Sequence, residues 1–235
     1  MLISFDRRFL FIHVDKAAGA SIQAALRKYA PQENRDVLRR RLVWLGALNR
    51  LAGLYRRIQF SEHVNASTMR GCLPPEMYRS MFKFAFVRNP WDRLVSRYSY
   101  LLRVQEHPRH RHVAQLAGFA EYLEWEIHRG KMHQYKYVTG HDGKLIVDFI
   151  GKFENLHADF ARVCAHLEIE AELSKLNASL HRDYRQYYTP ETRDRVAREF
   201  FRDVELFGYE FDGEAKMSGP RSRSQGADGV RAYVR

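Results

Sequence analysis

Short apolar runs alternate with segments of helical periodicity along most of this chain. Residues 9–14, 82–87 and 145–150 are rich in β-branched and aromatic side chains, which predicts three buried strands. Apolar residues recur at three- and four-residue steps between and after these runs. This spacing predicts helices over 19–30, 90–102, 119–128, 155–167 and 189–201. Strands that alternate with helices indicate an α/β fold, with a mostly parallel sheet and helices on both faces.

Residues 35–58 are the most basic part of the chain. Leucines recur there at helical steps, and seven arginines face one acid, Asp36. We interpret 31–60 as a basic helical insert and a candidate acceptor lid, in which Arg39 and Arg40 are candidate substrate contacts. A solvated helix face and peripheral contact with a membrane are the alternative interpretations. We expect one domain over 1–212 and a disordered tail over 213–235, which is rich in Gly, Ser and Arg.

The composition favours a globular protein with anionic partners. The chain has 235 residues, 45% of them hydrophobic, and a net charge of +11. Such a charge suits nucleotides, acidic sugars, nucleic acid or anionic lipid and does not choose among them. The two cysteines, Cys72 and Cys164, are expected to be reduced. No signal peptide is evident and no apolar stretch approaches about 18 residues, so we expect a cytoplasmic location.

A first candidate anion site follows the run at residues 9–14. Lys16 comes just after it, and a series of small residues leads to Gly19 and Ser21. Small residues allow a tight turn whose amides can face an anion at a helix N-terminus. The order of residues is not that of a Walker A loop, because the lysine precedes the small residues. A plain strand-to-helix turn with an exposed lysine is the alternative.

A second candidate anion site follows the run at 82–87. Arg88 ends this run, Asn89 is a candidate cap for the next helix, and Ser96 lies two turns into that helix. By helical spacing Arg93, Ser96, Arg97 and Tyr100 share the polar side of the helix. A phosphate there could receive a forked guanidinium and a hydroxyl. The alternative is that Arg88 only closes the strand with a salt bridge.

Taken together, the two segments resemble the donor-binding motifs of sulfotransferases. IHVDKAAGAS resembles the 5′-phosphosulfate loop, and FKFAFVRNPWDRLVSRYSYLL resembles the 3′-phosphate motif. The chain resembles carbohydrate sulfotransferases of the heparan 2-O- and chondroitin 4-O-sulfotransferase type over residues 8–30 and 60–211. Looser similarity runs through GKFENLHADFARVCAHLEI, LNASLHRDYRQYY and DVELFGYEF. The resemblance implies a three-layer α/β sandwich with a central parallel sheet, similar to that of P-loop NTPases.

The resemblance also implies a donor and its ligands. The donor is 3′-phosphoadenosine-5′-phosphosulfate (PAPS), and no metal is used. Lys16 would lie at the bridging oxygen between phosphate and sulfate, and the backbone at Ala18, Gly19, Ala20 and Ser21 would hold the 5′-phosphate. Arg88 and Ser96 would hold the 3′-phosphate. The chain departs from the family pattern at Asp15, which stands in place of proline, and at Ala17, Ala18 and Ala20. We expect weaker donor binding from these departures.

Sulfonate transfer calls for a base that accepts the proton of the acceptor hydroxyl, and histidine is the usual choice. His63, in SEHVNAS, is the candidate because the resembling enzymes carry a similar His-Val segment there. His133, in KMHQYKY, is a weaker candidate for an acceptor or donor contact. His13 is expected to be a buried strand histidine, and Glu154 to order the loop beside the donor. No histidine has zinc-ligand spacing.

The leading hypothesis is a PAPS-dependent sulfotransferase that acts on an acceptor hydroxyl, of a sugar or glycoconjugate, by in-line displacement with a histidine base. One alternative is a nucleotide-type kinase, which the missing Walker A order disfavours. Another is a basic module without enzymatic activity that binds nucleic acid or anionic membrane. Under the leading hypothesis nucleic acid is not expected as a partner. The sequence identifies neither the acceptor nor the oligomeric state.

Overall fold

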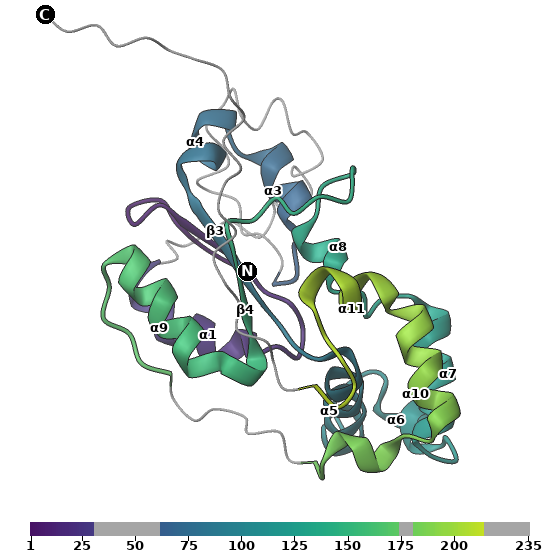
Figure 1. Ribbon diagram of the computed structural model, residues 1–235. Coiled ribbons are helices and arrows are strands. Elements are labelled where there is room, and N and C mark those ends of the chain that lie inside the picture. Colours follow the sequence, from purple (N-terminus) through teal and green to yellow (C-terminus); the bar gives the residue numbers. More distant parts are fainter. Residues whose placement is uncertain (31–61, 174–180, 214–235) are drawn as a thin grey trace, which may run out of the picture.

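A four-stranded sheet forms the centre of the protein (Figure 1). The computed structural model describes residues 1–30, 62–173 and 181–213. The strands are β1 (Leu2–Ser4), β2 (Phe9–Ile12), β3 (Phe82–Val87) and β4 (Phe149–Lys152), and they are ordered β1-β2-β3-β4. β2, β3 and β4 are parallel, whereas β1 pairs antiparallel with β2 at one edge. The carboxyl ends of β2, β3 and β4 therefore lie at the same edge of the sheet.

Helices connect these strands and follow the last of them. The described α-helices are α1 (Gly19–Leu26), α3 (Ala66–Cys72), α4 (Pro75–Ser80), α5 (Pro90–Arg103), α6 (His110–Ala114), α7 (Phe119–Arg129), α8 (Tyr135–Val138), α9 (Leu156–Leu167), α10 (Pro190–Glu199) and α11 (Phe201–Phe207). Short 3₁₀ turns are η1 (Arg27–Tyr29), η4 (Phe153–Asn155) and η5 (Tyr184–Tyr187). In the described segments no helix combines the length and apolar character needed to cross a bilayer.

Successive strand side chains point to opposite faces of the sheet, and each face has its own core. Phe9 and Phe11 belong to a core shared with α1 and α9. Leu10 and Ile12 belong to a core shared with α3, α5, α7 and α11. Figure 1 shows α1 and α9 on one side of the sheet and α3, α8 and α11 on the other. This arrangement confirms the predicted three-layer α/β fold with a central, mostly parallel sheet.

Local signals set the start of two helices. The Asn89 side chain accepts a hydrogen bond from Trp91 N at 3.0 Å, and Pro90 occupies the first turn of α5. Thr189 and Thr192 form a capping box at the start of α10. These caps satisfy amides that have no partner within the helix. The predicted helix starts at 90 and 189–190 are therefore correct.

Several predicted bounds are wrong. The strand predicted at 145–150 is β4 at Phe149–Lys152, and Leu145 makes only an isolated bridge with Thr139. The strand predicted over 9–14 ends at Ile12, and α10 ends at Glu199 before a separate α11 begins. Apolar content alone could not show which part of 145–152 pairs with β3. The insert at 31–60 and the tail from 214 lie outside the described residues, and the domain limit at 212 stays a prediction.

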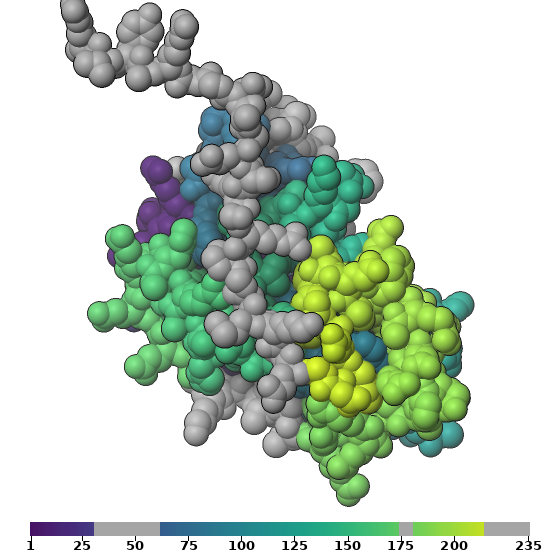
Figure 2. Space-filling view, viewed as in Figure 1, coloured from purple at the N-terminus to yellow at the C-terminus, as the bar shows by residue number. Residues whose placement is uncertain are grey.

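The last described segments complete the side of the molecule away from α9. Figure 2 shows the surface of α9 in green on one flank and that of residues 184–212, in lime to yellow, on the other. Among the residues of the second flank, Phe211 packs edge-on against Trp91 with ring centroids 5.6 Å apart. The Trp91 indole donates to Arg193 O at 3.0 Å. The start of α5, which follows β3, is thus held by the C-terminal part of the described chain.

Candidate active site

The two cationic segments meet at the carboxyl ends of β2 and β3. In this parallel pair Ile12 is the register partner of Ala85, so the residues that follow each strand leave the sheet side by side. The Arg88 guanidinium donates from Nη1 to Lys16 O at 3.4 Å. A cavity of about 940 Å³ opens here, and its lining includes Lys16, Ala18–Ser21, His63, Arg88 and Ser96. Every residue that the sequence assigned to donor binding therefore faces one cavity.

The turn after β2 brings the N-terminus of α1 to this cavity. Lys16 and Ala18 have φ of 64° and 61°, in the left-handed region that non-glycine residues rarely adopt. Ala18 is the N-cap of α1 and provides no side-chain hydrogen bond to it. The positive end of the α1 dipole, near residues that line the cavity, favours an anion there. Strain of this kind is typical of sites where the backbone binds a ligand.

Glycine is required at position 19 because the His13 ring lies against its Cα. A Cβ at Gly19 would lie 1.9 Å from two atoms of that ring. His13 is 5% exposed, as expected for a buried histidine, although it follows β2 and lines the cavity. The buried His13 ring thus packs directly against the backbone of the turn at Gly19.

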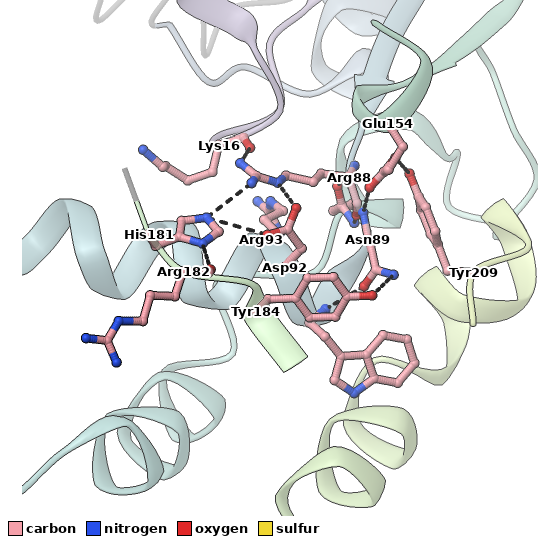
Figure 3. A network of polar contacts seen from close by, with 12 residues as sticks. Lys16, Arg88, Asn89, Asp92, Arg93, Glu154, His181, Arg182, Tyr184 and Tyr209 are labelled. Atoms are coloured by element: carbon pink, nitrogen blue, oxygen red, sulfur yellow. Dashed lines mark hydrogen bonds and ion pairs between the residues drawn. The ribbon is translucent and has the colours of Figure 1, made fainter. Parts of the chain in front are cut away.

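The Lys16 amine does not point at Arg88. It lies over the Tyr100 ring, 4.2 Å from the centroid, and Figure 3 shows the side chain directed away from the Arg88 guanidinium. Burial, together with the positive charges of Arg97, Arg88 and Arg103, lowers the pKa of Lys16 to about 8, while Asp15 acts in the opposite direction. Lys16 is therefore a cation near neutral pH that releases its proton more easily than an ordinary lysine.

Asp15 has an ion-pair partner other than Lys16. Its Oδ2 lies 2.9 Å from Arg97 Nη1. Burial acts to raise the pKa of Asp15, but the Arg97 and Arg93 guanidiniums outweigh it and lower that pKa. Arg93, expected on the same side of the helix as Arg97, also contacts Asp15: it is 2% exposed and donates to Asp15 O at 2.7 Å and to Met132 O. Arg93 therefore ties the turn after β2 to the loop before α8.

Arg88 is the centre of the polar network in Figure 3. Its Nε donates to Asp92 Oδ2 at 2.7 Å, and its Nη2 lies 3.3 Å from His181 Nε2. The Phe153 ring lies 4.0 Å from the guanidinium carbon. The salt bridge considered as the alternative role of Arg88 is therefore present, and the same guanidinium lines the cavity. Ser96, which lies farther along α5, is also buried and also lines the cavity.

The backbone around Arg88 is held by side chains from distant segments. The Gln134 amide accepts from Arg88 N at 2.9 Å and donates to Arg88 O at 2.7 Å. Asp203 accepts from the backbone amides of Gln134 and Tyr135, each at 2.8 Å, and its burial raises its pKa to about 6. Gln134 and Asp203 are both 0% exposed. These contacts fix the point at which Arg88 leaves β3.

Glu154 holds the residue after Arg88. Its Oε1 accepts from Asn89 N at 2.6 Å and its Oε2 from the Tyr209 hydroxyl at 3.0 Å, as Figure 3 shows. Burial raises the pKa of Glu154. Asn89 Nδ2 donates to Glu210 O at 3.0 Å. Glu154 therefore fixes the backbone at Asn89, next to Arg88 in the cavity lining.

His63 lies on the cavity wall beside His13. The two rings are 4.8 Å apart, and His63 Nδ1 lies 3.4 Å from His13 O. Because a carbonyl only accepts, Nδ1 donates in this contact and the lone pair of a neutral His63 ring is on Nε2. Burial, the N-terminal amine and His63 lower the pKa of His13 to about 3, so His13 is neutral although Glu62 Oε1 is 3.1 Å from its Nδ1.

One other predicted contact, His133, does not line the cavity. His133 packs on Phe200 with ring centroids 4.9 Å apart, faces Glu199 at 3.5 Å, and has its pKa lowered to about 4 by burial. It is absent from the residues that line the cavity. Arg39 and Arg40 lie outside the described residues. In the same segment Lys131, Met132 and Tyr137 line the cavity. Gln134, the neighbour of His133, holds the Arg88 backbone, and no sequence pattern pointed to it.

The lining of the cavity also includes a group of basic side chains. They are Arg103, His107, Arg109, Arg129 and Lys131. Arg129 pairs with the buried Glu126 at 2.7 Å, whereas the ion pairs of the described segments do not include the other two arginines or the lysine. Burial and the neighbouring Arg129 and Arg97 lower the pKa of Arg109. Within the described residues no group of histidine, cysteine and acidic side chains is placed to hold a metal ion.

Comparisons with known proteins agree with this geometry. The model of the sulfotransferase family matches residues 1–210. The crystal structure of mouse sulfotransferase SULT7A1 complexed with PAP matches over 87% of this chain and 88% of that chain, with 14% identity and a TM-score of 0.50. An uncharacterized protein of Archaeoglobus fulgidus is 30% identical over 121 residues, which cover 50% of this chain and 94% of that protein. This chain belongs to the sulfotransferase family, and its reaction class is sulfonate transfer.

Proposed function

We propose that this protein transfers the sulfonate group of PAPS to a hydroxyl of a carbohydrate or glycoconjugate. The observation that carries the proposal is that the Lys16–Ser21 turn and Arg88, 72 residues apart in sequence, line one cavity. The nucleotide carries phosphate groups at the 3′ and 5′ positions of its ribose, and the two segments offer a cation for each. The cavity volume of about 940 Å³ is at the upper end of the usual ~300–1,000 Å³ for small-molecule sites, which leaves room for part of an acceptor.

In the proposed reaction the acceptor oxygen attacks the sulfur while its proton passes to Nε2 of His63. The bond between sulfur and the 5′-phosphate oxygen breaks, and its electron pair leaves with adenosine 3′,5′-bisphosphate. Lys16 neutralises that leaving group. To do so its amine leaves the Tyr100 ring, where a cation–π contact contributes only about 0.5–1 kcal/mol at such partly exposed sites. A dianionic phosphate next to the amine outweighs this contact.

The basic side chains of the cavity lining bear on the acceptor. Arg103, Arg109 and Lys131 line the cavity in addition to the Lys16–Arg88 pair that suits the donor. This surplus of positive charge suits an acceptor with acidic groups and supports a carbohydrate of that kind over a neutral phenol. Radiolabelled sulfate transfer from PAPS to a panel of sugars, glycolipids and phenols distinguishes these classes. Transfer to phenols alone would rule out the carbohydrate assignment.

Donor binding is tested with adenosine 3′,5′-bisphosphate and thermal denaturation. A ligand at about 100 times its Kd stabilises by about 2.7 kcal/mol, which raises Tm by about 5–11 °C for a chain of this size. Arg88→Ala should remove most of that shift. Arg79→Ala, whose side chain is 65% exposed on α4, carries the same charge change and should keep it. No shift of the wild-type protein at millimolar bisphosphate would end the donor assignment.

The base is tested separately from donor binding. His63→Ala should bind the bisphosphate like the wild type and lose about 100- to 10,000-fold in turnover. His141→Ala removes an exposed histidine that does not line the cavity and should leave turnover unchanged. Full turnover of His63→Ala excludes His63 as the base and leaves the donor site untouched.

A further inference from the structure

His181 is brought to the donor cavity from a part of the chain 93 residues after Arg88. It lies outside the two motif-bearing segments, and its side chain is 7% exposed. It lines the same cavity as Lys16, Arg88 and Ser96. Figure 3 shows its ring directed at the Arg88 guanidinium and at Asp92.

The hydrogen bonds of the ring fix which nitrogen faces the cavity network. His181 Nδ1 lies 2.7 Å from Arg182 O and must donate to it, because a carbonyl only accepts. Nε2 therefore carries the lone pair of a neutral ring and lies 3.3 Å from Arg88 Nη2, which donates to it. The same Nε2 lies 3.5 Å from Asp92 Oδ1. The ring thus contacts both the Arg88 guanidinium, which suits a phosphate, and the Asp92 carboxylate, which pairs with that guanidinium.

We propose that His181 is a third ligand of the donor's 3′-phosphate, beside Arg88 and Ser96, with Nε2 as the contacting atom. The inference rests on the proposed use of PAPS and assigns a residue that neither donor motif contains. Arg88 holds one phosphate oxygen, the Ser96 hydroxyl donates to another, and His181 closes the site from the opposite side. Its role is to distinguish a nucleotide that carries the 3′-phosphate from one that lacks it.

Contact with the phosphate requires protonation of the ring. Nδ1–H is already committed to Arg182 O, so Nε2 can donate to a phosphate oxygen only in the imidazolium form. The charged groups that face the ring are Arg88 and Asp92, with Arg182 and Asp183 next to it on its own segment. A phosphate oxygen in this position would accept a hydrogen bond from Nε2.

The test crosses variants of His181 with two nucleotides by isothermal titration calorimetry. The ligands are adenosine 3′,5′-bisphosphate and adenosine 5′-monophosphate, which differ in the 3′-phosphate alone. Loss of a charged hydrogen bond should weaken bisphosphate binding of His181→Ala by about 10- to 100-fold. Binding of the monophosphate should change less than about twofold. His141→Ala serves as the matched control on the surface.

Two further variants separate a ligand from a structural role. His181→Gln places an amide nitrogen near the position of Nε2, whereas His181→Asn places one near Nδ1 and leaves Nε2 without a counterpart. Gln should bind the bisphosphate at least about threefold more tightly than Asn, and Asn should resemble Ala.

The outcomes separate this inference from the proposed function. If wild-type protein fails to prefer the bisphosphate over the monophosphate, the donor assignment itself is wrong. If the wild type prefers the bisphosphate and His181→Ala keeps that preference, His181 is not a ligand while the donor assignment stands. Equal losses for both nucleotides, or equal binding by the Gln and Asn variants, would show that the ring only supports the fold.

Discussion

The close contact between Gly19 and His13 leads to a testable prediction about the turn between β2 and α1. Replacing Gly19 with alanine places a methyl group 1.9 Å from Cδ2 and Nε2 of His13 and 2.6 Å from its Cε1. The ring has little room to retreat, because it is 5% exposed, stacks on Phe11 and lies 4.8 Å from the His63 ring. The added methyl must therefore displace either the ring or the turn.

The cost follows from overpacking of a buried site. Extra methyl groups in a well-packed interior cost about 1–3 kcal/mol, which corresponds to a fall in Tm of about 2–12 °C for a chain of this size. His13→Ala removes the ring that the methyl would meet. In the double variant the methyl has space, so Gly19→Ala should add nothing to the loss from His13→Ala. The coupling free energy between the two substitutions should be about 1–3 kcal/mol.

Thermal denaturation of the wild type, both single variants and the double variant measures this coupling. Gly71→Ala is the matched control, because a Cβ at Gly71 in α3 meets nothing within 4 Å. That variant should be as stable as the wild type or gain up to about 1 kcal/mol from the better helix propensity of alanine. Wild-type stability of Gly19→Ala, or full additivity in the double variant, would refute the contact as described.

Other predictions concern the residues that hold and charge the site. Gln134→Ala removes the side-chain partner of the buried Arg88 amide and carbonyl and should cost about 2–5 kcal/mol in denaturant unfolding; an unchanged midpoint would contradict this. With a pKa of about 8, Lys16 loses its charge as the pH rises, so bisphosphate affinity should fall above pH 8 in calorimetry, whereas Lys16→Arg should keep it to pH 9.5. Arg93→Lys cannot hold Asp15 O and the loop before α8 together and should raise KM for the donor more than it lowers kcat; unaltered kinetics would argue against that tie.

Much of the fold could be predicted because its signals are local. The strand at Phe82–Val87 is a continuous apolar run, and Asn89 and Pro90 mark the helix start after it. β1 was not predicted, since its three residues precede a polar turn and its only signature is pairing with β2. The start of β4 was predicted four residues too early, because only its pairing with β3 shows where it begins. Its pairing with Phe84 is a long-range choice that periodicity cannot express.

The residues of the candidate site also differ in how far the sequence alone could predict their positions. Lys16 and Arg88 each follow a strand, and neighbouring parallel strands bring such residues to one edge of the sheet. Gln134 and His181 lie 46 and 93 residues beyond Arg88, and their relation to it exists only once α5 and the later segments have packed. A glutamine or histidine in a loop carries no spacing that reveals such a contact. The sequence can thus indicate a candidate anion site without all of the residues that contact it.

Asp15 shows how an acidic residue can stand in an anion-binding turn. Taken alone, a carboxylate next to Lys16 would cancel the charge that a phosphate needs. Here its Oδ2 is paired with Arg97 at 2.9 Å, and its carbonyl receives the buried Arg93 at 2.7 Å. Both arginines come from α5, the helix that begins after Arg88. The local charge therefore stays positive. The contacts of Asp15 with Arg93 and Arg97 also hold the turn after β2 against α5, so the relative position of the two segments depends on Asp15.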